Sequence, residues 1–245
     1  MDIFSDLHLD VNREGPGCLA ATREAYRMLA MLPPVPRILD IGCGSGVQTL
    51  ELARLSGGYV VGLDMYRPLL DMLELRSRQA GLEERVQTVK GSMFAMDFDP
   101  ASFDIIWAEG AICIIGFAEG LRQWRHFLKP GGYIAVTEVS WLKPDPPAEV
   151  VRFWRQSHPG MRSVSENLTT ARDAGYREIG HFTLSRQAWW DEYHRPLQAR
   201  LEELRPRYAH DEQVLAVFEA ISRELELNLN YSEWFGYEFY VLQSI

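Results

Sequence analysis

Short apolar runs alternate with amphipathic stretches along the middle of the chain, between about Arg37 and Thr137. Each run has the length of a strand and is rich in β-branched and aromatic residues. Between the runs, apolar residues recur at helical spacing, most clearly from Phe117 to Leu128, where Lys129-Pro130-Gly131-Gly132 ends the pattern. The alternation predicts a mainly parallel sheet with helices on both faces and ligands at the carboxyl ends of its strands. The five runs are Arg37–Ile41, Tyr59–Leu63, Val86–Val89, Phe103–Trp107 and Tyr133–Val136.

The flanking sequence predicts further elements of the same domain. A helix is expected between Ala21 and Leu32, and Trp141–Pro147 is proline-rich and reads as irregular. Beyond it, the pattern predicts a helix, a strand, two long helices and a last strand, which makes a doubly wound α/β fold with seven strands. These elements are expected at Glu166–Ala174, Ile179–Leu184, Gln187–Leu204, Glu212–Leu229 and Trp234–Leu242. The expected segments are a cap at 1–34, a ligand-binding core at 35–185, a helical lid insertion at 186–232 and the final strand at 233–245.

Charge and composition exclude several classes of partner. The 245 residues carry 25 Lys and Arg against 34 Asp and Glu, a formal charge of -9, which opposes sequence-independent binding to nucleic acids or anionic membranes. The start of the chain lacks the basic and apolar regions of a signal peptide, and no run approaches the roughly 18 apolar residues of a membrane span. Cys18, Cys43 and Cys113 are odd in number and widely spaced, so we expect a cytoplasmic protein without disulfides or a zinc site.

The strongest local signal is a strand that runs directly into a glycine-rich turn, Asp40-Ile41-Gly42-Cys43-Gly44-Ser45-Gly46. Glycines let a ligand approach the backbone, and the helix that follows presents free N–H donors. Asp64 ends the next apolar run, where a carboxylate can accept hydrogen bonds from ribose hydroxyls. A tight turn without a ligand is the alternative. The dinucleotide fingerprint G-x-G-x-x-G/A fails, because Val47 stands at its third small position.

At these residues the sequence resembles the class I S-adenosylmethionine-dependent methyltransferases, particularly the small-molecule branch that includes enzymes of the ubiquinone and menaquinone biosynthesis type. The resemblance spans residues 35–140 and implies a Rossmann-like fold, S-adenosyl-L-methionine as cofactor, S-adenosyl-L-homocysteine as product and a small-molecule acceptor. The motifs that carry it are Asp40–Gly46, Asp64, Gly91-Ser92-Met93, Phe103–Ala108 and Leu128–Gly132. A closer likeness, to methyltransferase-like proteins of unassigned substrate, rests on Arg13–Gly17, Ala108–Ile112, Ile115–Phe117 and Glu138–Trp141.

The resemblance implies roles for the residues of the first motifs. Asp40 would orient the glycine loop or meet the amino group of the cofactor through water. Gly42 and Gly44 would let the methionine portion lie against the backbone, and Asp64 would hold the ribose diol. The whole implied cofactor-binding set is Arg13, Asp40, Gly42, Cys43, Gly44, Asp64, Met65, Ser92, Met93 and Glu109.

The adenine end of the implied site departs from the family. Met65 would pack on the ring, and Ser92 and Met93 would face its rim. Members of the family often have an acidic residue where Ser92 stands, and a hydroxyl can supply only a neutral contact. Adenine recognition is therefore expected to depend on backbone groups. Cys43 is expected to be a small packed residue rather than a nucleophile.

Two residues are candidates for the catalytic step. Glu109 follows the fourth predicted strand, where it is either a solvated carboxylate or a group that faces the sulfonium or accepts a substrate proton. His194 is the most suggestive histidine for a general base, although a surface position is the expectation we favour. Arg13 caps the cofactor carboxylate or is a surface arginine. Histidine spacing gives no metal site.

The C-terminal part is aromatic and acidic, and its aromatic residues are expected mainly to pack the last helices and strands. Trp189, Trp190, Tyr193 and Tyr231 are candidates for a lid over an apolar substrate. The sequence thus favours an S-adenosylmethionine-dependent methyltransferase. A non-catalytic protein that binds the cofactor or its product, and a nucleotide-dependent oxidoreductase, remain as alternatives, and the assembly is left open, with a homodimer as one arrangement.

Overall fold

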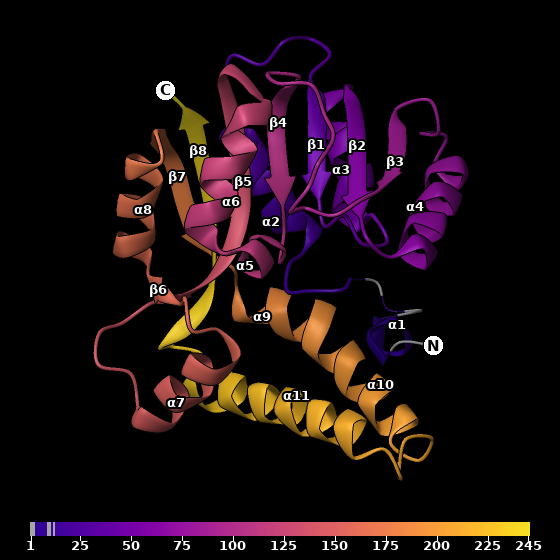
Figure 1. Cartoon of the computed structure of the whole chain (residues 1–245), viewed down its shortest axis with the longest axis vertical. Helices are drawn as coiled ribbons and strands as arrows, with labels where there is room; N and C mark the ends of the chain where they lie inside the picture. Colours follow the sequence, from indigo (N-terminus) through magenta and orange to yellow (C-terminus); the bar gives the residue numbers. More distant parts are fainter. Residues whose placement is uncertain (1–2, 9–10, 12) are drawn as a thin grey trace.

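The computed structural model describes residues 3–8, 11 and 13–245, and its centre is one twisted sheet (Figure 1). Seven strands form the order β3-β2-β1-β4-β5-β8-β7, and the two-residue β6 pairs beside the end of β5. β8 runs antiparallel to β5 and β7, whereas the other pairings are parallel. The strands are β1 (Arg37–Ile41), β2 (Tyr59–Asp64), β3 (Val86–Lys90), β4 (Phe103–Ala108), β5 (Leu128–Trp141), β6 (Arg162–Ser163), β7 (Tyr176–Thr183) and β8 (Phe235–Ser244).

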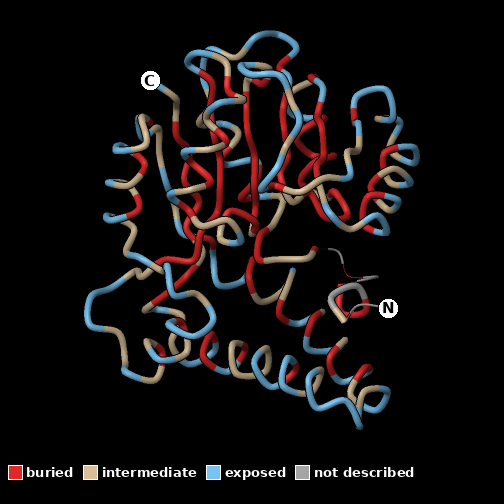
Figure 2. The backbone as a smooth tube through the Cα atoms, viewed as in Figure 1, coloured by how far each residue is buried: buried red, intermediate tan, exposed pale blue. Residues whose placement is uncertain are grey.

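Helices cover both faces of the sheet, which confirms the predicted α/β class. One core packs the sheet against α2 (Leu19–Arg27), α3 (Val47–Ser56) and α4 (Arg67–Gln79). The core on the other face includes residues of α5 (Ile112–Ile115), α6 (Phe117–Trp124) and α8 (Val164–Asp173). The central strands are buried over most of their length (Figure 2), as their near-continuous apolar sequence requires.

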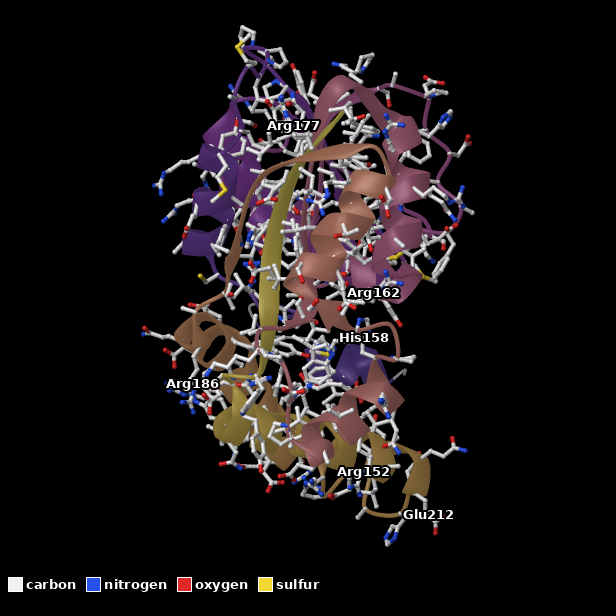
Figure 3. The ribbon with its side chains drawn as sticks, turned by 90° about the vertical axis from the view of Figure 1, so that its left-hand side faces the viewer. Arg152, His158, Arg162, Arg177, Arg186 and Glu212 are labelled. Carbon is white, nitrogen blue, oxygen red and sulfur yellow. The ribbon has the colours of Figure 1, made fainter. Side chains whose placement is uncertain are left out.

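A layer of helices lies below the carboxyl ends of the parallel strands (Figures 1 and 3). Between β7 and β8 the chain forms α9 (Arg186–Trp189), the π-helix η2 (Trp190–His194), α10 (Arg195–Leu204) and α11 (Glu212–Tyr231). Figure 3 shows Arg186 and Glu212, which begin α9 and α11, in this lower layer, and Arg177 of β7 in the upper one. The helices have a core of their own, in which Leu197 and Leu201 pack with Phe218 and with Leu7 of α1 (Ile3–His8).

Several details of the elements differ from the prediction. The helix α7 (Ala148–Ser157) was not predicted, because it buries only Val150 and Trp154. The helix expected over Gln187–Leu204 is confirmed as one continuous helical run over 186–204, in which the π-helix η2 lies between α9 and α10. β5 begins at Leu128 rather than Tyr133, because a register shift against β4 accommodates the glycines. The short β6 was not expected either.

Among the described residues, no helix has both the length and the apolar character needed to cross a membrane.

Candidate functional site

A cavity of about 180 Å³ opens where the parallel strands end. The ends of β1, β2, β3 and β4 and the segment Arg13–Pro16 all contribute to its wall. This is the edge of the sheet at which ligands are expected. The polar and apolar side chains on the wall include Arg13, Glu14, Gln48, Asp64, Met65, Tyr66, Met93, Phe94, Glu109 and Ile114.

The turn between β1 and α3 needs its glycines. Gly42, Gly44 and Gly46 have φ values of 71°, 54° and 83°, which other residues rarely adopt. A Cβ on Gly42 would lie 2.6 Å from the Cβ of Ala111, and one on Gly44 would lie 2.1 Å from Glu14 Oε2. The loop therefore packs closely against Ala111 on one side and Glu14 on the other, and its backbone forms part of the cavity wall.

Asp64 holds this loop in place and still has acceptor capacity. Its Oδ2 accepts a hydrogen bond from Gly44 N at 3.0 Å, and its Oδ1 accepts one from Tyr66 N at 2.9 Å. Each oxygen of an ionised carboxylate has more than one acceptor position, so one bond per oxygen leaves room for others. Since Asp64 is only partly buried and lines the cavity, those positions are available to a ligand.

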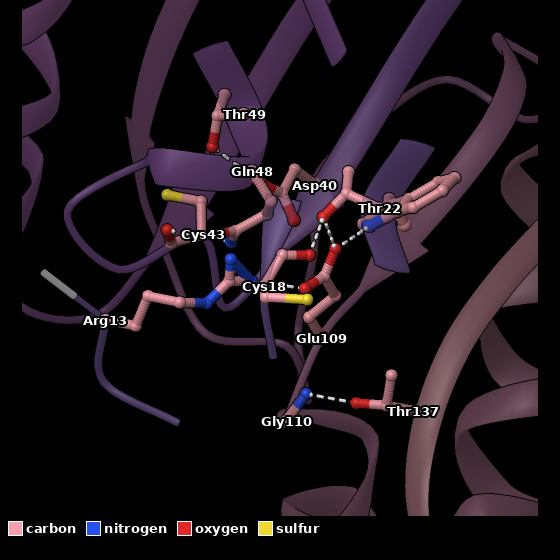
Figure 4. A network of polar contacts seen from close by, with 11 residues as sticks. Arg13, Cys18, Thr22, Asp40, Cys43, Gln48, Thr49, Glu109, Gly110 and Thr137 are labelled. Carbon is pink, nitrogen blue, oxygen red and sulfur yellow. Dashed lines mark hydrogen bonds and ion pairs between the residues drawn. The ribbon is translucent and has the colours of Figure 1, made fainter. Parts of the chain in front are cut away.

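Glu109 and Arg13 form a buried ion pair in the cavity wall (Figure 4). One oxygen of Glu109 accepts from Arg13 Nη2, and the other accepts from Thr22 Oγ1 at 2.7 Å and from Trp107 Nε1 at 2.9 Å. Three protein donors therefore hold the carboxylate of Glu109 in one orientation. The Nη1 atom of Arg13 is buried and has no hydrogen-bond partner within the described part of the chain.

Glu14 lies directly over the glycine loop. The side chain and backbone of Ser45 hydrogen-bond to its carboxylate, and Ser45 Oγ in turn accepts from Arg76 Nη1 at 2.7 Å. Burial raises the pKa of Glu14 above its ordinary value, and the bonds from Ser45 partly oppose that shift. Its Oε1 is buried and, among residues 3–8, 11 and 13–245, has no hydrogen-bond partner. An unpaired donor on Arg13 and an unpaired acceptor on Glu14 thus occur beside the same loop.

Three members of the expected cofactor-binding set do not line the cavity. Asp40 is fully buried; its Oδ2 accepts from Thr49 Oγ1 at 2.6 Å, and burial raises its pKa to about 7. Cys43 is also buried, which raises the pKa of its thiol well above the ordinary value and makes a thiolate unfavourable. Ser92 Oγ accepts from Phe94 N at 3.3 Å, a contact within its own turn.

His194 lies in the helical layer, apart from the residues that line the cavity. Its side chain is 1% exposed, so the expected surface position is wrong. It packs against the rings of Trp189, Trp190 and Tyr193, and its Nε2 lies 3.7 Å from Glu224 Oε1. None of the four aromatic residues considered for a lid lines the cavity.

The structure brings Arg13, Gly42, Gly44, Asp64, Met65, Met93 and Glu109 together on one wall. Sequence reasoning gave no role to Glu14 or Phe94. Glu14 stands within the quoted Arg13–Gly17 motif, and Phe94 follows Met93 directly, so both lie next to residues that were identified. Phe94 is 55% exposed and Met65 58%, and both present apolar surface to the cavity. The described residues contain no group of three or more metal-binding side chains.

Known proteins resemble the chain in both sequence and fold. Residues 38–132 match the family described as "Methyltransferase domain". Sterol 24-C-methyltransferase ERG6 of Saccharomyces cerevisiae is 34% identical over 188 residues, covering 75% of this chain and 46% of the yeast protein. The 24-methylenesterol C-methyltransferase 2 of rice, Oryza sativa subsp. japonica, is 28% identical over 197 residues, covering 75% of this chain and 54% of the rice protein. The chain thus spans about half the length of these two curated relatives.

A solved structure shares the whole fold. The SAM-dependent methyltransferase of Thiobacillus denitrificans, crystallised with S-adenosyl-L-homocysteine, has a TM-score of 0.83 and 22% identity, covering 100% of this chain and 99% of that chain. The ordered motifs, the matching domain and this architecture agree with one another. Residues 38–132 therefore carry a methyltransferase domain, and the chain has the fold of the S-adenosyl-L-homocysteine-bound methyltransferase from Thiobacillus denitrificans.

Proposed function

We propose that the chain is an enzyme that transfers a methyl group from S-adenosyl-L-methionine to a small-molecule acceptor by direct displacement. The observation that carries this proposal is the glycine loop of β1–α3, with Asp64 fixed against it on the wall of the cavity. The family to which the domain belongs and the curated relatives, which are named as C-methyltransferases of small molecules, support it.

The residues present fit an adenosyl amino acid. Asp64 has free acceptor positions for a ribose diol, and Met65, Met93 and Phe94 offer apolar surface to a flat ring. At the other end, the unpaired Nη1 of Arg13 suits a carboxylate and the unpaired Oε1 of Glu14 suits an ammonium group. We therefore assign these residues to the binding of S-adenosyl-L-methionine, with S-adenosyl-L-homocysteine as the product.

When bound, the cofactor supplies an electrophilic methyl group on a positively charged sulfonium. The protein's part is to align and desolvate the reactants, which can account for several kcal/mol of a reaction barrier. Glu109 places a carboxylate close to this region, and Arg13 orients it. Glu109 accepts three hydrogen bonds from the protein, from Arg13, Thr22 and Trp107, so we assign it an electrostatic role rather than the removal of a proton.

Two measurements test the proposal. Calorimetric titration is expected to show binding of S-adenosyl-L-homocysteine and no comparable binding of NAD, and tight binding of NAD alone would contradict the family assignment of the site. Incubation with methyl-labelled cofactor and a metabolite extract is expected to label a small molecule. Firm cofactor binding without transfer to any acceptor would instead support a non-catalytic binding protein.

For location and assembly, we propose a cytoplasmic protein, which the three free cysteines support, and a homodimer. Light scattering on the purified protein distinguishes a dimer from the 28.1 kDa monomer.

A further inference from the structure

A second cavity, of about 830 Å³, lies beyond the end of β5. The segment after β5, α7, the start of α8 and His181 of β7 enclose it, and it shares no lining residue with the first cavity. Figure 3 shows His158 at this level, between the sheet above and the helical layer below. Most of the wall is apolar, which suits a small organic ligand of ordinary size. The apolar lining residues are Trp141, Leu142, Pro144, Pro146, Val151, Trp154, Pro159, Met161, Val164 and Leu168.

Two of the lining side chains, Trp154 and His158, carry polar groups whose partners the structure defines. Trp154 is 5% exposed, and its indole Nε1 has no hydrogen-bond partner in the described structure. His158 is held by Glu138, whose Oε1 lies 2.5 Å from the Nε2 of the ring, and Glu138 itself is 3% exposed. A carboxylate that accepts from one ring nitrogen fixes the ring, and the other nitrogen of a neutral imidazole is then an acceptor. The unpaired indole N–H thus belongs to a residue that lines the cavity, and an unpaired buried donor calls for an acceptor.

The charge of the lining has the opposite sign to that of the whole protein. The lining contains Lys143 and Arg155 and no carboxylate, although the chain has a net charge of -9. The carboxylates of Glu138 and Glu238 lie behind the lining and contact His158 and His181. Lys143 is paired with Glu233 at 2.6 Å, whereas Arg155 is exposed and has no ion pair among the described residues. One unpaired positive charge at an apolar cavity therefore favours an occupant with one negative charge.

We propose that this cavity is a second small-molecule site, which binds an apolar compound carrying a single anionic group, such as a carboxylate or sulfonate. The apolar part lies against the tryptophan, proline and leucine side chains. The anionic group accepts from Trp154 Nε1 and lies in the field of Arg155. Because this site has its own walls and its own charge, it stands whether or not the first cavity performs methyl transfer.

The probe pair for this site is 8-anilinonaphthalene-1-sulfonate and its neutral counterpart N-phenyl-1-naphthylamine, each titrated by fluorescence. The anionic probe is expected to bind with a stoichiometry near one and more tightly than the neutral one. Arg155→Glu replaces an attraction by a repulsion and is expected to lower the affinity for the anionic probe by at least about tenfold, with little effect on the affinity for the neutral probe. Arg152→Glu is the matched control, since it makes the same charge change on the same helix, and Arg152 does not line this cavity.

The result must also separate the two cavities. Saturating S-adenosyl-L-homocysteine is expected to leave the affinity for the anionic probe unchanged, because the cavities share no lining residue. Raising the salt concentration is expected to lower the affinity for the anionic probe and not that for the neutral probe. Equal losses in the two variants, equal affinity for the two probes, absence of binding, or displacement by S-adenosyl-L-homocysteine would each overturn the second site. Failure of S-adenosyl-L-homocysteine to bind would count against the proposed function and not against this site, which the two arginine variants test directly.

Discussion

Replacing Asp64 by Asn removes one negative charge from the wall of the first cavity at nearly constant shape. In the structure the two carboxylate oxygens each accept one backbone N–H, at 3.0 and 2.9 Å, and keep further acceptor positions. The amide of Asn places a donor where one oxygen stood, so it cannot accept at both atoms. Loss of a hydrogen bond to a charged group costs about 1.5–3 kcal/mol, which corresponds to a roughly 10- to 150-fold increase in Kd.

Calorimetric titration with S-adenosyl-L-homocysteine and with adenosine measures this effect. Both ligands contain the ribose, so both are expected to lose affinity by a similar factor. Asp71→Asn is the matched control: it makes the same change of charge at an exposed residue of α4 whose ion pair with Arg67 is worth at most about 1 kcal/mol. Thermal unfolding of each variant shows whether the loop remains folded. Unchanged affinity in Asp64→Asn, or an equal loss in Asp71→Asn, would refute the role of Asp64 in binding.

Three further predictions concern the buried charges around the first cavity. Glu14→Gln is expected to lower the affinity for S-adenosyl-L-homocysteine about fivefold or more and to leave the affinity for adenosine unchanged, because the unpaired Oε1 is assigned to the ammonium group. Equal losses of affinity for the two ligands would contradict that assignment. Arg13→Met leaves Glu109 charged and unpaired in the interior, so urea unfolding is expected to show a loss of about 3–5 kcal/mol; a loss of similar size when Glu109→Gln is added would argue against the ion pair as its cause. The pKa of Asp40 in the folded protein, about 7, lies above its ordinary 3.8, so its protonated form stabilises the fold fully below pH 3.8, and this stabilisation is lost as pH rises to 7, at about 1.4 kcal/mol per pH unit. In urea unfolding, Asp40→Asn is expected to lack this dependence of the unfolding free energy on pH. An unchanged dependence would assign it to another group.

The sequence was sufficient to predict those features that depend on a few neighbouring residues. The strand of β1, its glycines and the carboxylate that ends β2 are each read from a few neighbouring residues, since conformational preference and periodicity act over short distances. The parallel arrangement followed as well, because alternating strands and helices can bury their apolar faces in few other ways. The register then brought the ends of β1 and β2 together at one edge of the sheet.

The tertiary structure decided what each side chain meets. Arg13 and Glu109 are 96 residues apart, and no pattern in the chain indicates that they form an ion pair. Glu14 and the glycine loop likewise come together only because the N-terminal segment folds over the end of the sheet.

His194 shows the same limit. Its neighbours in sequence are polar and aromatic, and only the packing of the helical layer determines that it is buried. The sequence by itself thus determined the α/β sheet, the glycine turn and the position of Asp64, because backbone preference and apolar period are properties of short segments. The pairing of Arg13 with Glu109, the place of Glu14 and both cavities were decided only by the tertiary structure, because they depend on contacts between segments that are distant along the chain.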